Sequence, residues 1–149
     1  MRFICDHMLG ALARWMRLLG FDVLYPGPIS DREIIGIAVE EDRVILTRDK
    51  ELSSTDKAQA LYVESDDLEE QLLATMSELE LKVTDPMSRC SLCNAQIEKV
   101  DKTSVEGEVP EGVFDRQEEF WYCPTCNKYY WQGSHWDRIT KTIEKLVGS

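Results

Sequence analysis

Two Cys-x-x-Cys pairs place the strongest constraint on how this chain can fold. Cys90 and Cys93 form the first pair, Cys123 and Cys126 form the second, and 29 residues separate the two pairs. Such an arrangement is typical of structural zinc sites, in which four thiolates close a tetrahedral shell around the ion. Redox-active cysteines and disulfides are the alternatives. We predict one structural zinc ion held by these four cysteines.

The residues around the cysteines indicate a small module built on that ion. Asn94 and Asn127 each follow a pair, where a knuckle turn needs a left-handed residue, a conformation that Asn tolerates better than most residues. The segments EEFWYC and KYYWQ indicate the strands of a ribbon hairpin. We expect a zinc ribbon over residues 87–133, held together mainly by its ion because so small a module has little core. Ser134 can cap a final helix over residues 134–149.

Residues 1–86 alternate short apolar segments with amphipathic ones and are expected to form a separate domain. Four apolar segments indicate strands, over residues 2–5, 21–25, 43–47 and 60–63. Other segments carry apolar residues at helical spacing, over residues 8–19, 30–42 and 66–79. Strands separated by helices pair in parallel, with helices on both faces of the sheet. The sequence therefore predicts an α/β fold with a parallel sheet.

Aspartates stand where two of these strands end. Asp6 follows the first strand and Asp49 follows the third, so the two lie side by side if their strands are neighbours. Asp31 opens the helix over 30–42 and joins them only if that end of the helix lies near the same edge. Converging carboxylates repel one another unless a cation or a proton is present, and oxygen ligands suit Mg²⁺ or Mn²⁺. The alternative is that Asp6 and Asp49 only cap the helices that follow them.

The charge of the chain limits which partners it can bind. The formal net charge is −11, and residues 1–86 carry 9 Lys and Arg against 18 Asp and Glu. A nucleic-acid surface would have to be a local basic patch on an acidic body. The chain begins with the strand-like MRFIC and has no apolar segment long enough to span a bilayer. Four of the five cysteines stand in pairs typical of metal binding, which agrees with a reducing compartment. We therefore expect a soluble cytoplasmic protein and no membrane partner.

Three segments resemble one known family. The chain combines CDHMLGALARWMRLLGFDV near its start, SDREIIGIAVEEDRVILTRDKEL in the middle and YYWQGSHW after the last cysteine pair. Together they are similar to the PIN-like ribonuclease family named for the C-terminal region of the Mut-seven exonuclease. The resemblance covers essentially the whole chain. It implies metal-dependent RNA cleavage on a PIN-like three-layer α/β/α sandwich with a zinc-ribbon module.

The leading hypothesis is therefore a ribonuclease that cleaves RNA phosphodiester bonds at an Asp-bound site. Asp6, Asp31 and Asp49 would hold Mg²⁺ or Mn²⁺, which activates water for an in-line displacement. Ordinary PIN domains carry a fourth acidic residue; here either a site of three aspartates suffices, or Glu33, Asp66 or Asp67 supplies the missing charge. Phosphate contacts are assigned to the arginines near the predicted site, which are Arg14, Arg17 and Arg48.

The alternative function is a non-catalytic RNA- or ribosome-associated binding module with the same fold. In that case the acidic residues are structural, and the aromatic residues of the ribbon bind RNA by base stacking. Packing of the ribbon is the other interpretation of these aromatics. His135, in GSHW, has either a hydrogen-bonded structural role or a catalytic one.

Overall fold

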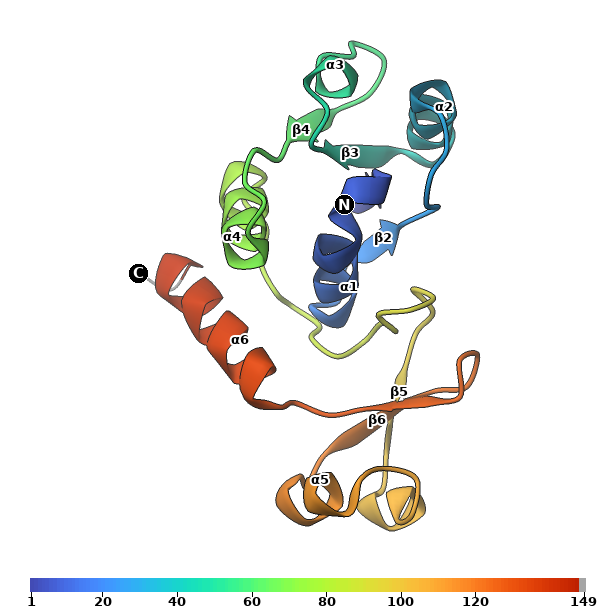
Figure 1. Ribbon diagram of the computed structural model, residues 1–149, viewed down its shortest axis with the longest axis vertical. Helices are drawn as coiled ribbons and strands as arrows, with labels where there is room; N and C mark the ends of the chain where they lie inside the picture. Colours follow the sequence, from blue (N-terminus) through green and yellow to red (C-terminus); the bar gives the residue numbers. More distant parts are fainter. Residues whose placement is uncertain (148–149) are drawn as a thin grey trace. The chain divides into compact units, whose positions relative to one another are not determined.

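Four strands form a single parallel sheet in the computed structural model, which describes the backbone of residues 1–147 and the side chains of residues 1–145 (Figure 1). The spatial order of the strands is β2-β1-β3-β4. Their bounds are Arg2–Cys5 for β1, Asp22–Leu24 for β2, Arg43–Thr47 for β3 and Ala60–Tyr62 for β4. Cys5 lies opposite Leu46, so the carboxyl ends of β1 and β3 meet at one edge. The predicted parallel sheet is confirmed.

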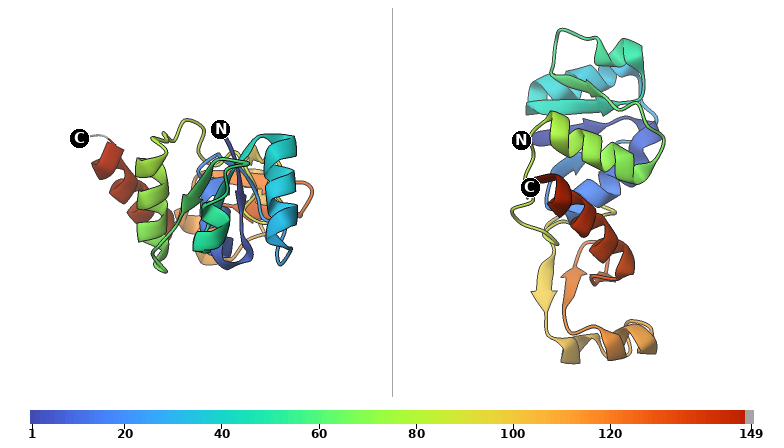
Figure 2. Two further views of the ribbon diagram at one scale, coloured as in Figure 1. Left: turned by 90° about the horizontal axis from the view of Figure 1, so that it is seen from above. Right: turned by 90° about the vertical axis from the view of Figure 1, so that its left-hand side faces the viewer.

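Helices cover both faces of this sheet. On one face, α1 (Gly10–Leu18) packs against α4 (Leu68–Glu78), and on the other α2 (Asp31–Glu41) and α3 (Lys50–Ser53) lie against β3 (Figure 2). Five buried apolar residues tie the second pair of helices to the sheet: Ile4, Ile34, Ala38, Ile45 and Leu52. Apolar positions at helical spacing direct one face of each helix inward. The α/β architecture with helices on both faces is as predicted.

The second part of the chain contains a three-stranded antiparallel sheet in the order β5-β6-β7. The hairpin of β6 (Phe120–Cys123) and β7 (Lys128–Tyr130) was predicted, whereas β5 (Glu98–Val100) was not. Shorter elements are the 3-10 helices η1 (His7–Leu9) and η2 (Lys102–Val105) and the helix α5 (Glu111–Arg116). The last helix, α6, spans Ser134–Val147, so the end of the predicted helix at 148–149 lies outside the described residues. Each helix within residues 1–147 is too short or too polar to cross a bilayer.

The chain divides into two compact units, residues 1–94 and residues 95–149. The division falls after Asn94 because the segment before it packs on the first unit. The Met87 amide donates to the Leu18 carbonyl at 2.7 Å, and the Asn94 side chain accepts from the Val23 amide at 3.1 Å. The domain boundaries expected at 86/87 and 133/134 stay a prediction.

A charge cluster around Asp22 fixes β2 to its neighbours. Arg43 donates to the Asp22 carboxylate at 2.9 Å and the Asn94 side-chain amide donates at 2.8 Å, while Arg2 and Arg89 form longer ion pairs with it. Partial burial by itself raises the pKa of Asp22, but the hydrogen bonds from Asn94 and Arg43 outweigh burial and hold the pKa at about 2. The charged form is therefore the one that stabilises the fold.

We expect Asp22→Asn to lower the free energy of unfolding by about 2 kcal/mol at pH 7. Because the folded pKa is depressed, this contribution is present above the unfolded pKa of about 4 and is lost as the pH falls through the folded value. Urea unfolding at several pH values checks this, and the difference between the two proteins should shrink from pH 5 toward pH 2. Asp56→Asn, at an exposed position, is the control. Equal stability of Asp22→Asn and the parent at pH 7 would contradict the prediction.

Candidate functional site

Asp6 is a buried carboxylate at the carboxyl end of β1, with 5% of its surface exposed. One carboxylate oxygen, Oδ1, accepts a hydrogen bond from the Met8 amide at 3.0 Å. The other, Oδ2, accepts from the Arg48 amide at 3.1 Å and from the Thr47 hydroxyl. The Asp6 amide in turn donates to the Leu46 carbonyl at 3.1 Å. Both the backbone and the carboxylate of Asp6 are therefore fixed in place.

Thr47 links Asp6 to Asp49. It is fully buried at the end of β3, and its hydroxyl oxygen accepts from the Asp49 amide at 2.9 Å while the hydroxyl donates to Asp6. The pairing of β1 with β3 therefore brings these two aspartates to adjacent positions on one edge of the sheet, connected by a single side chain. The neighbouring placement expected from the sequence is observed.

Asp49 is exposed and caps α3. Its Oδ1 accepts from the Glu51 amide at 2.9 Å and from the Leu52 amide at 3.5 Å. Asp6 caps η1 in the same way, so the capping interpretation describes part of what both residues do. Capping uses only Oδ1 of Asp49, and no described residue donates to its Oδ2. Capping and cation binding are therefore compatible at this position.

Asp31 lies in the first turn of α2, exposed to solvent, directly after the N-cap Ser30. Ser30 and Glu33 form the predicted capping box, which uses Oε1 of the Glu33 carboxylate. The three aspartates do not form a close set of ligand atoms, since within residues 1–147 only the four cysteines do so among groups of three or more potential ligands. Of the other acids considered, Asp67 caps α4 and Asp66 is exposed. Asp31 and a fourth acid thus stay predictions.

The three arginines considered for phosphate contact differ in exposure. Arg14 is exposed on α1, whereas Arg17 is buried and donates to the carbonyls of Val23 and Ser91, both at 2.9 Å. Burial also lowers the pKa of the Arg17 guanidinium. Arg48 donates to the Glu64 carbonyl at 3.0 Å, and its buried Nε has no hydrogen-bond partner among the described residues. Arg14 and Arg48 are therefore better placed than Arg17 to meet a phosphate.

The four cysteines gather into one group. Their Sγ atoms all lie within 4.8 Å of one another, and Cys90 and Cys123 are buried. Four thiolates at a Zn–S distance of about 2.3 Å around a tetrahedral ion are about 3.8 Å apart, so this set fits the dimensions of a zinc site. None of the cysteines, all of which lie in the described part of the chain, forms a disulfide. The four cysteines can hold a zinc ion.

The backbone around the cysteines has the geometry of knuckle turns. The Leu92 amide donates to Cys90 Sγ and the Cys126 amide donates to Cys123 Sγ, both at 3.4 Å. Such N–H donors stabilise the thiolate form that binds metal. Asn94 has a φ of 68° and Asn127 a φ of 53°, which are the left-handed conformations predicted for these residues.

Comparison with known proteins assigns the chain to a family. The sequence profile described as the Mut7-C RNAse domain matches residues 1–143, a span that takes in both strand-end aspartates and all four cysteines. The chain belongs to the Mut7-C RNAse domain family. Comparisons with curated proteins and with solved structures give no significant match. Membership indicates a nuclease-type domain whose substrate class is RNA.

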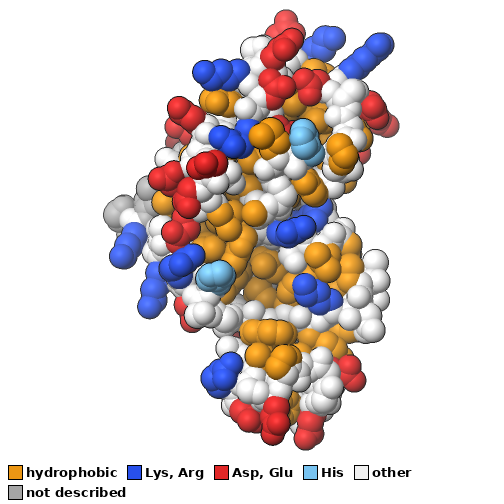
Figure 3. All heavy atoms as spheres, in the orientation of Figure 1, with side chains coloured by type: hydrophobic (Ala, Val, Ile, Leu, Met, Phe, Trp, Pro, Cys, Tyr) orange, Lys and Arg blue, Asp and Glu red, His pale blue; other side chains and the backbone are white. Residues whose placement is uncertain are grey.

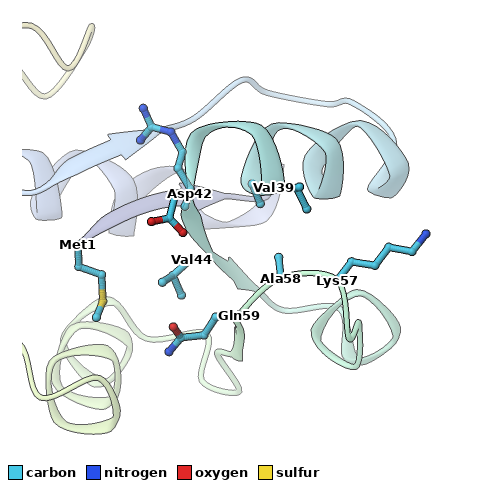
Figure 4. A pocket seen from close by; sticks show the side chains of 9 residues that line it. Met1, Val39, Asp42, Val44, Lys57, Ala58 and Gln59 are labelled. Atoms are coloured by element: carbon cyan, nitrogen blue, oxygen red, sulfur yellow. The ribbon is translucent and has the colours of Figure 1, made fainter.

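Three hollows of this Mut7-C chain, beside α2, β3 and β4, are not lined by the strand-end aspartates. One hollow of about 490 Å³ opens beside the amino end of β3, where Met1, Val39, Lys57 and Gln59 line it (Figure 4). Asp6 and Asp49 lie at the opposite, carboxyl end of the strands.

In the upper part of the face shown in Figure 3, Lys and Arg side chains are interspersed with Asp and Glu side chains. In the second unit, the rings of Tyr122 and Tyr129 lie 4.7 Å apart across β6 and β7, while Phe120 is fully buried against Trp131. Part of the aromatic cluster therefore packs the ribbon. His135 is exposed at the start of α6, and its role stays open to test.

Proposed function

We propose that this Mut7-C chain is a ribonuclease that cleaves RNA phosphodiester bonds at a divalent-ion site on the carboxyl edge of its parallel sheet. The observation that carries the proposal is the arrangement of Asp6, Thr47 and Asp49. A buried carboxylate held by three donors is linked through the Thr47 hydroxyl to the backbone amide of Asp49, whose own carboxylate is exposed. In open parallel sheets, ligands bind beyond the carboxyl ends of the strands.

The chemistry of these donors fits Mg²⁺ or Mn²⁺. All the candidate ligands are carboxylate oxygens, the type that hard cations prefer. A carboxylate has about four lone-pair positions, of which Asp6 uses three, and Asp49 keeps Oδ2 open. When bound, the ion supplies an activated water and stabilises the charge on the leaving oxygen. Because carboxylates repel one another without a cation, we propose that Asp31 completes the set only in the ion-bound form.

The RNA backbone would be held by Arg48 beside the aspartates and by Arg14 on the exposed side of α1. We leave Arg17 out because its guanidinium serves the fold. Phosphate contacts give affinity without sequence preference, and on a chain with a net charge of −11 few phosphates can be neutralised. We therefore expect weak RNA binding that decreases only gradually as the salt concentration rises, because the salt dependence scales with the number of phosphates neutralised.

A cleavage assay on a mixture of labelled RNAs tests the function directly. We expect fragments in the presence of Mg²⁺ or Mn²⁺ and none after a chelator removes the ion. The chelation should be brief and mild, followed by a check of bound zinc, so that loss of the cysteine-held ion is not mistaken for loss of the catalytic one. Cleavage that continues without divalent ions would contradict the proposed mechanism.

The second candidate function is a binding module without catalysis. The capping hydrogen bonds of Asp6 and Asp49 favour it, since they give both aspartates a structural role. The cleavage assay distinguishes the ribonuclease from the binding module, because a non-catalytic module would bind RNA and leave it intact at every ion concentration. Ribosome association and a cytoplasmic location belong to either candidate and stay predictions.

The buried position of Asp6 leads to a stability prediction that distinguishes it from Asp49. Asp6→Asn replaces one acceptor oxygen by an NH₂ group, which then faces a donor, either the Met8 amide or the Arg48 amide. We expect the free energy of unfolding to fall by about 1–3 kcal/mol, in addition to loss of cleavage. Urea unfolding measures this. Thr47→Ser keeps the hydroxyl and is the control, and an Asp6→Asn protein as stable as the parent would contradict the hydrogen-bond argument.

A further inference from the structure

The β4 edge of the parallel sheet is open. β4 is the last strand in the order β2-β1-β3-β4, and among residues 1–147 it pairs only with β3. The Ile45 amide donates to the Gln59 carbonyl at 2.9 Å, and the Val63 amide donates to the Thr47 carbonyl at 2.7 Å. In a parallel ladder alternate residues bond to the same neighbour, so the backbone groups of Ala60 and Tyr62 point away from β3. An edge of this kind can accept a further strand.

A groove of about 650 Å³ runs beside this edge, between β4 and α4. Its floor includes the half-buried Leu61 and the exposed Ala74. On α4, Glu70, Ala74 and Glu78 follow one another at intervals of four residues and so lie on one stripe of the helix. This stripe is exposed, and it lines the groove together with Leu61 and Tyr62 of the open strand.

The rim of the groove is acidic. Glu64, Glu70 and Glu78 line it, and no Lys or Arg does. None of the three carboxylates forms an ion pair with another residue in the described part of the chain, although Glu70 accepts a hydrogen bond from the Ser65 hydroxyl. This local charge repels RNA and also repels the same edge of a second copy of the chain. It is complementary to a basic partner.

We propose that the open edge of β4 binds an extended peptide segment with a basic residue at every second position. The peptide backbone would pair with the outward groups of Ala60 and Tyr62. Side chains of a strand alternate between faces, so every second residue would point into the acidic groove. The residues between would lie on the face where Ala60 packs against the apolar core of α2 and α3, which favours small or apolar side chains there.

This proposal goes beyond the nuclease and does not depend on it. The groove is formed by residues 61–78, whereas the proposed cleavage site rests on Asp6 and Asp49. A protein that binds such a peptide and cleaves no RNA would support the peptide-binding proposal and contradict the nuclease proposal. The two can therefore fail separately.

Titration of the full chain with a short capped peptide in which Lys alternates with Val tests the proposal. We expect amide signals of residues 60–64 and 70–78 to shift in NMR spectra. A peptide with the same composition in two blocks, Lys first and Val second, should bind about tenfold more weakly because its charges cannot all enter the groove. Equal binding of both peptides, or shifts elsewhere in the chain, would overturn the proposal.

Two variants probe the surface itself. Glu70→Lys combined with Glu78→Lys reverses the charge of the groove rim and should weaken peptide binding about tenfold or more. The control is Glu40→Lys combined with Glu111→Lys, which makes the same change in net charge at exposed positions elsewhere. Ala74→Trp fills the groove and keeps every acidic residue, and it should weaken binding with the fold intact by circular dichroism. Peptide affinity unchanged in both groove variants would overturn the proposal, as would a concentration-dependent dimer that shifts the same amides without peptide.

Discussion

Replacing Asp49 by asparagine should reduce ion-dependent RNA cleavage by on the order of 100-fold or more and leave the fold intact. Asparagine keeps the shape of the side chain and can still cap α3, because Asn and Asp are nearly equal as N-caps. It removes the negative charge that a hard cation needs. We expect the free energy of unfolding to change by no more than about 0.5 kcal/mol, since the lost interaction with the helix N-terminus is small and repulsion from Asp6 is relieved.

Glu51→Gln is the matched control for this experiment. Glu51 is an exposed acid in the first turn of α3, and its substitution removes the same charge from the same helix. Any general effect of charge on the approach of RNA appears in both variants, whereas loss of an ion ligand appears only in Asp49→Asn. Cleavage rates over a range of Mg²⁺ and Mn²⁺ concentrations are the measurement. Full cleavage by Asp49→Asn, in protein free of contaminating nuclease, would remove this residue from the site.

Removal of zinc should unfold the ribbon. We expect purified protein to carry about one zinc ion per chain, and a structural zinc site of four thiolates contributes on the order of 10 kcal/mol to the folding of such a module. Strong chelation should therefore abolish the ordered signals of the ribbon, residues 87–133, which NMR detects. Binding should also weaken as the pH falls, because the thiolates must be deprotonated to bind the ion.

Single cysteine variants test the same site. Cys126→Ser should lose the zinc and the ordered ribbon, whereas Cys5→Ala, which also removes one thiol, should keep both. Cys5 is fully buried in β1, and burial raises the pKa of its thiol, so it behaves as a small apolar core residue. Metal analysis measures the zinc content of the parent, Cys126→Ser and Cys5→Ala proteins. A metal-free parent protein whose ribbon remains ordered would contradict the zinc assignment.

The strands of the first sheet could be predicted from the sequence because apolar segments bounded by polar residues have a strong local signal. β1 and β3 have the predicted bounds, and β2 is shorter than expected by one residue at each end. Elements without such a signal were missed. α3 spans only Lys50–Ser53, too short to show a helical period, and β5 is a charged segment that pairs with residues about twenty positions away. Its pairing is a tertiary effect that no local pattern contains.

The candidate site was predicted in part for a related reason. Adjacent placement of Asp6 and Asp49 follows from the parallel pairing of their strands, which the sequence pattern indicates. The position of Asp31 depends on the conformation of the loop between β2 and α2, which hydrophobic periodicity does not determine. The burial of Arg17 was missed although a signal was present. Arg17 stands four residues after the buried Ala13 and next to the buried Met16, on the inner stripe of α1.

The fixed carboxylate of Asp6 has a consequence for spectroscopy. Two backbone amides from separate parts of the first unit, those of Met8 after β1 and Arg48 after β3, donate to its two different oxygens. Their proton resonances therefore respond to the electron density on one side chain. A cation that approaches Asp6 withdraws density from both oxygens and should move both resonances in the same direction, whereas a shift of the β3 end should move only that of Arg48. The amide proton signals of Met8 and Arg48 can therefore be used to follow ion binding without a label, a substrate or catalytic turnover.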